Sequence, residues 1–183
     1  MLLPALLIIA VVAGLYWQAN VRRQDQPMPP ASEEPMLIFS TAFGPGSPIP
    51  QKYTCDGEDA NPPLGFSNVP KDTVSLALVM DDPDAPAGVW VHWLLWNMEP
   101  STVQIAENSV PAKAIQGQAS SGRNAYGGPC PPSGRHRYFF KLYALDTKLN
   151  LPSYSSATEL EQAMVGHVLA KAELMGTYGR SGK

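Results

Sequence analysis

The sequence contains 183 residues, 44% of them hydrophobic and 16% charged, with a formal net charge of -3. This length suits one domain with extensions, and the hydrophobic content is sufficient for a core. Lys and Arg occur in runs of no more than two, so the sequence lacks the basic patch typical of nucleic-acid binding. Its 19 prolines and 15 glycines are typical of a loop-rich, mostly β chain rather than a helical bundle.

The first 21 residues predict a transmembrane anchor or an uncleaved signal. Residues 2–17 carry no charged side chain. A helix of that length spans roughly 24 Å of the ~30 Å hydrocarbon core, and extension to Val21 brings it to a plausible length. No clear A-x-A cleavage motif and no lipid-acceptor cysteine follow. Residues 22–35 are rich in proline and acidic residues and indicate a linker. We expect the folded domain over residues 36–183.

Two opposing signals bear on the membrane side of this domain. Arg22 and Arg23 follow the apolar segment, and the positive-inside rule would keep them and the domain in the cytoplasm. An apolar amino terminus followed by a tether is instead typical of export. Because two arginines are a weak signal, we expect a single-pass anchor with the domain outside the cytoplasm.

Four apolar stretches predict β-strands, at residues 37–40, 74–80, 91–98 and 136–145. The second is a continuous apolar run, which favours a central strand covered on both faces. In the last, alternation places four side chains on one face: His136, Tyr138, Phe140 and Leu142. Strands joined by long Pro- and Gly-rich loops indicate an antiparallel sheet protein.

Residues 158–175 form the one good helix that the sequence predicts. Thr158 with Glu161 three residues later matches a capping box, and apolar residues recur near helical spacing up to Gly176. We expect this helix to cover one face or one end of the sheet. His167 lies on or beside the apolar stripe, and we interpret it as a packed or surface histidine without a chemical role.

The chain has two cysteines, Cys55 and Cys130, and no CxxC pair. Zinc-ribbon and thioredoxin-like sites are therefore excluded. A disulfide between the two forms if the domain occupies an oxidising compartment, and two free buried thiols are the alternative. The residues leave both open.

Polar, titratable side chains concentrate in two apolar stretches, at residues 81–93 and 126–140. Asp82 ends the strand-like run at residues 74–80, where Pro83 stops it, and His92 begins the next run. If these strands pair, Asp82 comes within hydrogen-bonding distance of His92, fixes its tautomer and raises its pKa.

The loop before His136 consists of small residues and prolines. Its glycines allow backbone N–H groups to approach a ligand, and its prolines stiffen the wall. Two imidazoles, a phenol and bare amides together suit a small oxyanion such as phosphate. We therefore predict one ligand-binding pocket that contains Asp82, His92, Pro131, Pro132, His136 and Tyr138.

Other interpretations of the same residues remain open. Each polar group alone suits a local role, for example Asp82 as the cap of a turn. Asp82, His92 and His136 match a two-histidine, one-carboxylate iron site if they converge on one point. Cys130, if reduced and exposed, is a candidate hydrolase nucleophile, whereas Ser133 lacks the G-x-S-x-G context.

Four motifs of the chain resemble the phosphatidylethanolamine-binding protein family, in particular its bacterial and archaeal Raf kinase inhibitor-like branch. They are YTCDGEDANPPLGF, DDPDAPAGVWVHWLLWN, YGGPCPPSGRHRYFFKLYALD and AMVGHVLAKAELMGTY, and the resemblance covers about residues 36–180. It implies a large antiparallel sheet packed on a smaller one, a helix near the carboxyl terminus, and a pocket for phosphate-like anions at the sheet end.

The pocket residues that the resemblance implies are Asp82, His92, His136 and Tyr138, with Pro131 or Pro132 in the wall. The chain departs from the family at residues 117–124, GQASSGRN, which lack the aromatic and acidic residues of relatives. This departure bears on the pocket rim and so on selectivity. Nothing in the sequence reproduces a kinase-binding surface.

We therefore expect a membrane-tethered module that binds phosphate or a phospholipid headgroup, with no cofactor and no nucleic-acid partner. His92, oriented by Asp82, and His136 would donate to the anion, Tyr138 would complete the contact, and protonation near about pH 6–7 would strengthen binding. The alternatives are a hydrolase or metal-dependent enzyme that uses the same Asp/His/His pocket, and a protein-interaction inhibitor of a kinase or protease.

Overall fold

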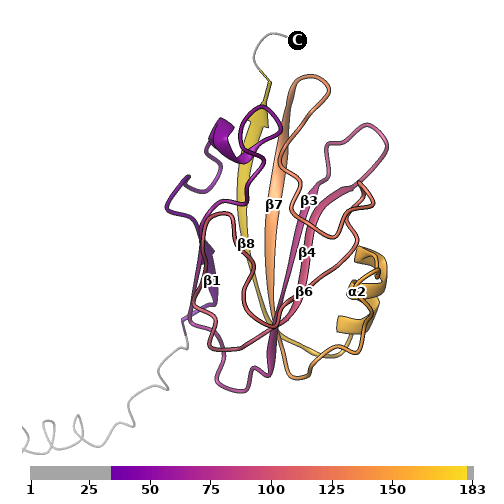
Figure 1. The fold of residues 1–183 in the computed structure, drawn as a ribbon. Coiled ribbons are helices and arrows are strands. Elements are labelled where there is room, and N and C mark those ends of the chain that lie inside the picture. Colours follow the sequence, from indigo (N-terminus) through magenta and orange to yellow (C-terminus); the bar gives the residue numbers. More distant parts are fainter. Residues whose placement is uncertain (1–33, 181–183) are drawn as a thin grey trace, which may run out of the picture. The chain divides into compact units, whose positions relative to one another are not determined.

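The computed structural model describes residues 34–180, and these form two antiparallel sheets and one α-helix (Figure 1). The larger sheet has the strand order β6-β4-β3-β7-β8, and the smaller has the order β1-β2-β5. In the larger sheet the strands are β3 (Ser75–Asp82), β4 (Trp90–Met98), β6 (Ile115–Gln116), β7 (Arg135–Leu145) and β8 (Val168–Gly179). The remaining elements are β1 (Leu37–Phe39), β2 (Leu64–Ser67), β5 (Gln104–Ile105), the 3-10 helix η1 (Gln51–Tyr53) and helix α2 (Ala157–Met164). The predicted fold class, a large antiparallel sheet packed on a smaller one with a helix near the carboxyl terminus, is confirmed.

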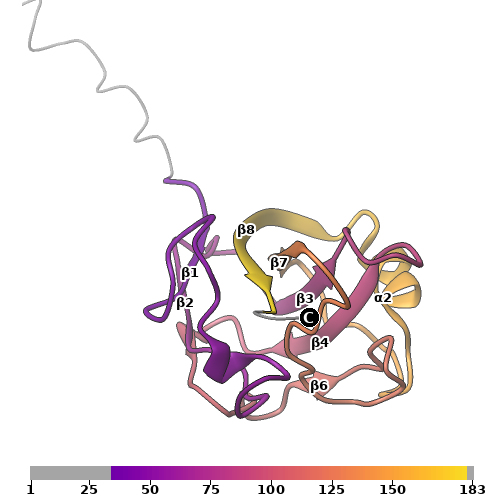
Figure 2. The ribbon, with the colours of Figure 1, turned by 90° about the horizontal axis from the view of Figure 1, so that it is seen from above.

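Strand β3 lies at the centre of the larger sheet because its apolar side chains are covered on both faces. All eight of its residues are buried. Leu76, Leu78 and Met80 belong to one core cluster, and Ala77 and Val79 belong to a second. Figure 2 shows the two layers that provide this cover, with β1 and β2 on one side of the larger sheet and α2 on the other. The predicted central strand is confirmed.

Strand β7 carries the predicted alternation. His136, Tyr138, Phe140 and Leu142 are all buried, while Arg135 and Arg137 between and before them are exposed. Because the larger sheet is antiparallel, β3 ends at the same end of the sheet at which β4 and β7 begin. The polar residues of the two sequence stretches therefore meet at that end.

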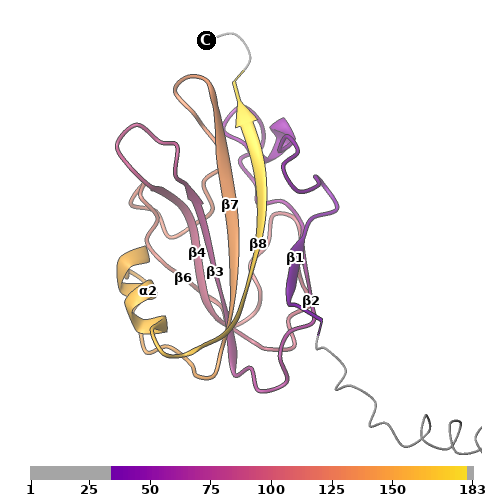
Figure 3. The ribbon, with the colours of Figure 1, turned by 180° about the vertical axis from the view of Figure 1, so that it is seen from behind.

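The predicted helix over residues 158–175 is wrong in its second half. Helix α2 ends at Met164, and Gly166 follows with a φ of 81°, the left-handed conformation that commonly terminates a helix. From Val168 the chain is strand β8 (Figure 3). Its Ala172 and Leu174 are buried in the core. Good helix formers adopt a strand here because the edge of β7 offers hydrogen-bonding partners along almost all of β8.

Helix α2 begins at a capping box that lies before the predicted one. The Ser156 side chain accepts from the backbone N–H of Glu159, and the Glu159 carboxylate accepts from the backbone N–H of Ser156. The sequence had predicted Thr158 and Glu161 for these positions. Leu160 is buried in the second core cluster, so α2 covers one face of the larger sheet as expected.

The predicted membrane anchor at residues 1–21 lies outside the described residues, and so does most of the predicted linker at residues 22–35. Within residues 34–180, no helix has the length and hydropathy needed to cross a bilayer. The first core residue of the described chain is Met36, which is buried in the first core cluster.

Candidate functional site

A pocket of about 320 Å³ lies at the end of the larger sheet where β3 ends and where β4 and β7 begin. It contains five of the six residues predicted from the sequence: Asp82, His92, Pro131, Pro132 and His136. The rest of the wall comes from Cys130, Trp90 and residues 85–87 of the loop between β3 and β4. The pocket therefore has a few polar groups in an otherwise apolar wall, which is typical of small-molecule sites.

Asp82 ends strand β3 and accepts two hydrogen bonds. Its Oδ2 accepts from Nδ1 of His136 at 2.7 Å, and its Oδ1 accepts from the backbone N–H of Asp84 at 2.8 Å. The predicted pairing of Asp82 with His92 is wrong. Asp82 lies opposite Trp90 in the register of β3 with β4, and β7, the neighbour on the other side of β3, supplies the imidazole instead. This buried carboxylate orients His136 and holds the start of the loop.

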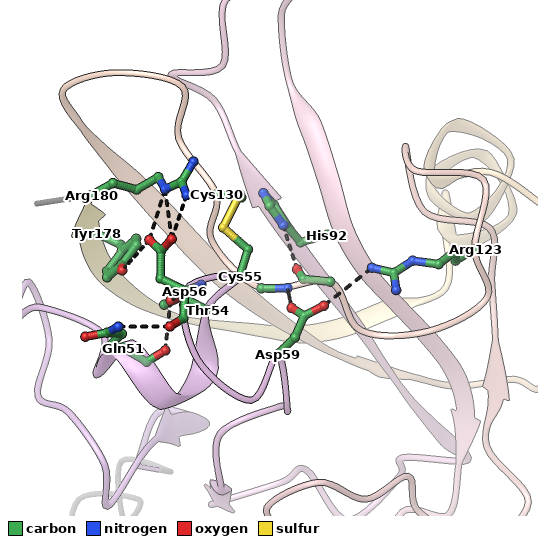
Figure 4. Close-up of a disulfide and its surroundings, with 12 residues drawn as sticks. Gln51, Thr54, Cys55, Asp56, Asp59, His92, Arg123, Cys130, Tyr178 and Arg180 are labelled. Carbon is green, nitrogen blue, oxygen red and sulfur yellow. Dashed lines mark hydrogen bonds and ion pairs between the residues drawn. A yellow bond between two sulfur atoms is a disulfide. The ribbon is translucent and has the colours of Figure 1, made fainter. Parts of the chain in front are cut away.

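His92 is oriented by the backbone rather than by a carboxylate. Its Nδ1 lies 2.7 Å from the carbonyl oxygen of Gly127 (Figure 4). Burial lowers the pKa of His92, and the hydrogen bond to Gly127 opposes that shift only in part. A neutral His92 therefore carries its proton on Nδ1, and its Nε2 is buried without a hydrogen-bond partner among the described residues.

Tyr138 lies behind His92 and does not line the pocket. It is fully buried, and its ring packs edge-on against His92 with 5.3 Å between the ring centroids. Burial first, and then the negative charge of Asp82, raise the pKa of Tyr138. Its hydroxyl has no hydrogen-bond partner within the described chain. The structure therefore places Tyr138 as a support for His92, whereas the sequence predicted a direct ligand contact.

A disulfide joins Cys55 to Cys130, with their Cα atoms 5.4 Å apart (Figure 4). It settles the two alternatives that the sequence left open for these cysteines. Because Cys130 lines the pocket, the disulfide fixes one wall of the pocket to the segment that follows η1. The bond also removes Cys130 as a candidate thiol nucleophile.

A second connection holds the same loop through backbone groups. The N–H of Gly128 donates to Oδ1 of Asp59 at 2.6 Å, and the N–H of Gly127 donates to the carbonyl of His92 at 3.1 Å. A Cβ at Gly128 would lie 2.5 Å from the carbonyl oxygen of Tyr53, so only glycine fits. Sequence reasoning missed Asp59 and Gly127, since nothing in their own sequence context identifies a partner so distant along the chain.

The segment that carries Cys55 is itself anchored to the end of β8 by Asp56. Its carboxylate accepts from the guanidinium of Arg180, with the shortest distance 2.7 Å, and from the hydroxyl of Tyr178 at 2.9 Å (Figure 4). This bidentate geometry is a strong form of ion pair. The disulfide therefore joins the pocket wall to a segment that is already fixed.

Asp84 holds the loop between β3 and β4. Its carboxylate accepts from the backbone N–H and the guanidinium of Arg137 at distances from 2.7 to 2.9 Å. These hydrogen bonds lower the pKa of Asp84 to about 2. The apolar side of the pocket, formed by that loop, is thus fixed to strand β7.

The geometry also bears on the metal interpretation and on the third histidine. Within residues 34–180, no group of three or more His, Cys, Asp or Glu side chains is arranged so that it could hold a metal ion. Asp82, His92 and His136 therefore do not converge as an iron triad requires. His167 is exposed and pairs with Asp146 at 2.8 Å, which is a surface position away from the pocket.

Residues 39–179 match the family model described as phosphatidylethanolamine-binding protein. The chain belongs to the phosphatidylethanolamine-binding protein family. A UPF0098 protein from Methanothermobacter thermautotrophicus is 49% identical over 150 residues, which cover 79% of this chain and 99% of that protein.

Solved structures of this family share the fold. A phosphatidylethanolamine-binding protein homolog from Chlamydia trachomatis has 43% identity and a TM-score of 0.78, covering 80% of this chain and 99% of that one. Escherichia coli YbcL, described as a member of the mammalian phosphatidylethanolamine-binding protein family, has 29% identity and a TM-score of 0.76 over the same shares. The resemblance identified from the four sequence motifs is confirmed.

Residues 117–124, where the chain departs from the phosphatidylethanolamine-binding protein pattern, lie beside β4. The N–H of Ser120 donates to the carbonyl of Val91, and the N–H of Gly117 donates to the carbonyl of Leu94. None of these eight residues lines the pocket. Arg123 of this segment pairs with Asp59 at 3.6 Å, and Asp59 accepts from the N–H of Gly128, so the segment contacts the pocket loop indirectly.

Proposed function

We propose that this phosphatidylethanolamine-binding protein domain binds a small phosphate-like anion, either free phosphate or the phosphate group of a phospholipid headgroup. The observation that supports this is the pair of buried histidines, His92 and His136, that line one largely apolar pocket. Each ring has its Nδ1 engaged by an acceptor, which leaves Nε2 as the nitrogen for a ligand. Family membership favours the same ligand class.

In this proposal His136 is the donor to the anion. When protonated, it holds Nδ1–H on Asp82 and offers Nε2–H to a ligand oxygen, and the carboxylate stabilises the positive ring. Because burial lowers the pKa of His92, that ring stays neutral. The sequence predicted that both histidines donate to the anion, and this proposal keeps that role for His136 alone. Asp82 acts by positioning His136, since its own charge repels an anion.

The apolar wall suits the organic part of a monoester. Trp90, Pro131 and Pro132 line the pocket beside the histidines, and Trp90 is 41% exposed. An uncharged substituent on the phosphate can lie on this wall and remove apolar surface from water. Free phosphate would leave the wall unused, so a monoester should bind more tightly.

Calorimetry on the full-length chain tests the proposal with three probes: inorganic phosphate, phosphoethanolamine, and vesicles with or without phosphatidylethanolamine. We expect both soluble anions to bind, with Nε2–H of His136 as the donor to a ligand oxygen. Binding by the soluble anions alone would indicate a free phosphate compound, and binding to the lipid vesicles would indicate the headgroup.

Variants of two histidines provide the control for that experiment. His136→Gln should weaken phosphate binding at least about tenfold, because a charge-assisted hydrogen bond is lost. His167→Gln makes the same substitution at an exposed histidine away from the pocket and should leave phosphate binding unchanged. Equal phosphate affinity in the unchanged protein and in a folded His136→Gln variant would contradict the role of His136.

We also propose that the domain is tethered outside the cytoplasm by residues 1–21. The disulfide between Cys55 and Cys130 supports an oxidising compartment. Expression of the full-length chain in a bacterial host should place it in the membrane fraction, with the domain digested by protease added to spheroplasts. Protection from that protease, with a cytoplasmic marker also intact, would contradict the orientation.

A further inference from the structure

The two nitrogens of His92 have opposite hydrogen-bonding roles, and the backbone sets them. A carbonyl oxygen can only accept, so the 2.7 Å contact with Gly127 requires the proton on Nδ1. In the neutral ring Nε2 is then a bare acceptor. The residue is 6% exposed and lines the pocket, and its Nε2 is buried, so this acceptor is hidden from bulk water.

No nearby group in the described chain donates to that nitrogen. The other polar groups of the pocket wall are Asp82, a carboxylate that accepts, and His136, whose Nδ1 donates to Asp82. The hydroxyl of Tyr138 is the closest candidate donor by ring contact, yet it makes no hydrogen bond within the described residues. A buried acceptor without a donor is costly, so a ligand that brings a donor gains by satisfying it.

We propose that His92 selects ligands that carry a proton: the pocket prefers oxyanions with a hydroxyl, such as protonated phosphate, a phosphate monoester monoanion or a phosphonate, over oxyanions without one, which include the phosphodiester of phosphatidylethanolamine. This inference rests on the proposed function and adds its selectivity. A P–OH donates to Nε2 of His92 while another ligand oxygen accepts from His136. A sulfonate or sulfate places only lone pairs against Nε2, which leaves the acceptor unpaired and adds repulsion.

A pair of matched monoanions tests this on the full-length chain. In mildly acidic buffer methylphosphonate is a monoanion with one P–OH, and methanesulfonate is a monoanion of the same shape with none. Calorimetry should show methylphosphonate binding at least about tenfold more tightly than methanesulfonate. Charge and size are equal, so the ratio of the two affinities reports the proton alone.

Substitution of His92 locates the selectivity. In His92→Gln the side-chain amide can turn its NH2 group toward the ligand, so the ratio of affinities should fall to about one, largely through tighter sulfonate binding relative to phosphonate. His167→Gln should keep the ratio of the unchanged protein. The unchanged ratio in His167→Gln would show that the loss of selectivity in His92→Gln is not a general effect of replacing a histidine.

The outcomes distinguish this inference from the proposed function. If both monoanions bind the unchanged protein with equal affinity, the selectivity of His92 is wrong and anion binding stands. If neither these two anions nor inorganic phosphate binds, the proposed function fails and the inference fails with it. If the ratio stays high in a folded His92→Gln variant, some other group selects the proton.

Discussion

The two histidines of the pocket are held by different parts of the molecule and in different ways. His136 is held by charge: Asp82 accepts from its Nδ1, and Asp84 fixes the adjoining loop to Arg137. His92 is held by backbone: the carbonyl of Gly127 accepts from its Nδ1, in a loop that a disulfide ties down. Two histidines of one pocket are therefore oriented by different groups, one by a carboxylate and the other by a backbone carbonyl.

This difference determines what each ring can do. A carboxylate partner stabilises a positive imidazole, so the His136 side is suited to donate to an anion. A carbonyl partner fixes the tautomer without supplying a full charge, and burial lowers the pKa of His92. One ring is suited to donate and the other to accept. The pocket is therefore asymmetric, and each side can be changed separately.

The largest expected effect comes from breaking the His92 side at its disulfide. Replacing both Cys55 and Cys130 by serine opens a loop with a sequence separation of 75 residues. The free energy of unfolding, measured by urea denaturation, should fall by about 2–5 kcal/mol. Reductant should bring the unchanged protein to the same midpoint and leave the variant unaffected. An unchanged midpoint in the variant would mean that Asp56 and Asp59 hold the segment without the disulfide.

Breaking the His136 side at Asp82 should have the next largest effect on stability. Asp82→Ala leaves His136 Nδ1 and the Asp84 N–H without their acceptor, but it also removes the cost of burying a carboxylate, so we expect a total loss of about 1.5–3 kcal/mol. Asp146→Ala removes the matching partner of exposed His167 and should cost less than about 1 kcal/mol. Urea denaturation of both variants measures the contrast, and equal losses would contradict the importance of burial.

The pH dependence of stability sharpens the comparison on the His92 side. Above its ordinary pKa of 6.5, His92 is neutral in both the folded and the unfolded chain. As the pH falls below 6.5 toward its lowered folded pKa, only the unfolded chain gains the proton, so stability falls by at most about 1.4 kcal/mol per pH unit.

The variant His92→Gln lacks this contribution. The difference in unfolding free energy between the unchanged protein and the variant should therefore shrink as the pH falls from about 7 to about 5. All other titrating groups are common to both proteins, so the difference isolates His92. A difference that stays constant over this range would mean that the ring is not held neutral.

The smallest expected effect concerns the ion pair between Asp84 and Arg137. Asp84→Asn should leave the unfolding midpoint nearly unchanged, because the Arg137 side chain is 53% exposed. It should increase amide hydrogen exchange in the loop at residues 85–89 and weaken phosphate binding by less than about threefold. Glu99→Gln, at another exposed pair, serves as the control. Unchanged exchange in the loop would show that Asp82 alone holds it.

The fold was largely predictable because the long strands are nearly continuous apolar runs. The apolar run at residues 74–80 and the alternation at residues 136–145 were sufficient to predict β3 and β7. Strand β8 was not predictable from local pattern, because its Ala, Lys, Glu and Leu residues favour a helix and only pairing with β7 overrides that preference. Gly166 was the one local signal that the helix ends early.

The site was predictable in composition and not in connectivity. Titratable residues at the ends of apolar runs identified Asp82, His92 and His136 as neighbours, and the structure places all three in one pocket. Which imidazole meets Asp82 depends on strand order, since β3 has a neighbour on each side. The partner of His92 is the backbone carbonyl of Gly127. Every residue has such a carbonyl, so residue types in the sequence cannot identify this partner.

Strand β8 forms the outer edge of the larger sheet, and its two halves differ in whether another segment covers that edge. Near Thr177 the loop at residues 46–49 hydrogen-bonds to that edge and covers it. Over residues 168–174 the described chain places no further strand there, and the exposed ion pair of Lys171 with Glu173 lies on this part. An uncovered edge is a template for another chain, and charged side chains oppose such pairing. These two residues therefore help to keep crowded copies of the protein from joining edge to edge into aggregates.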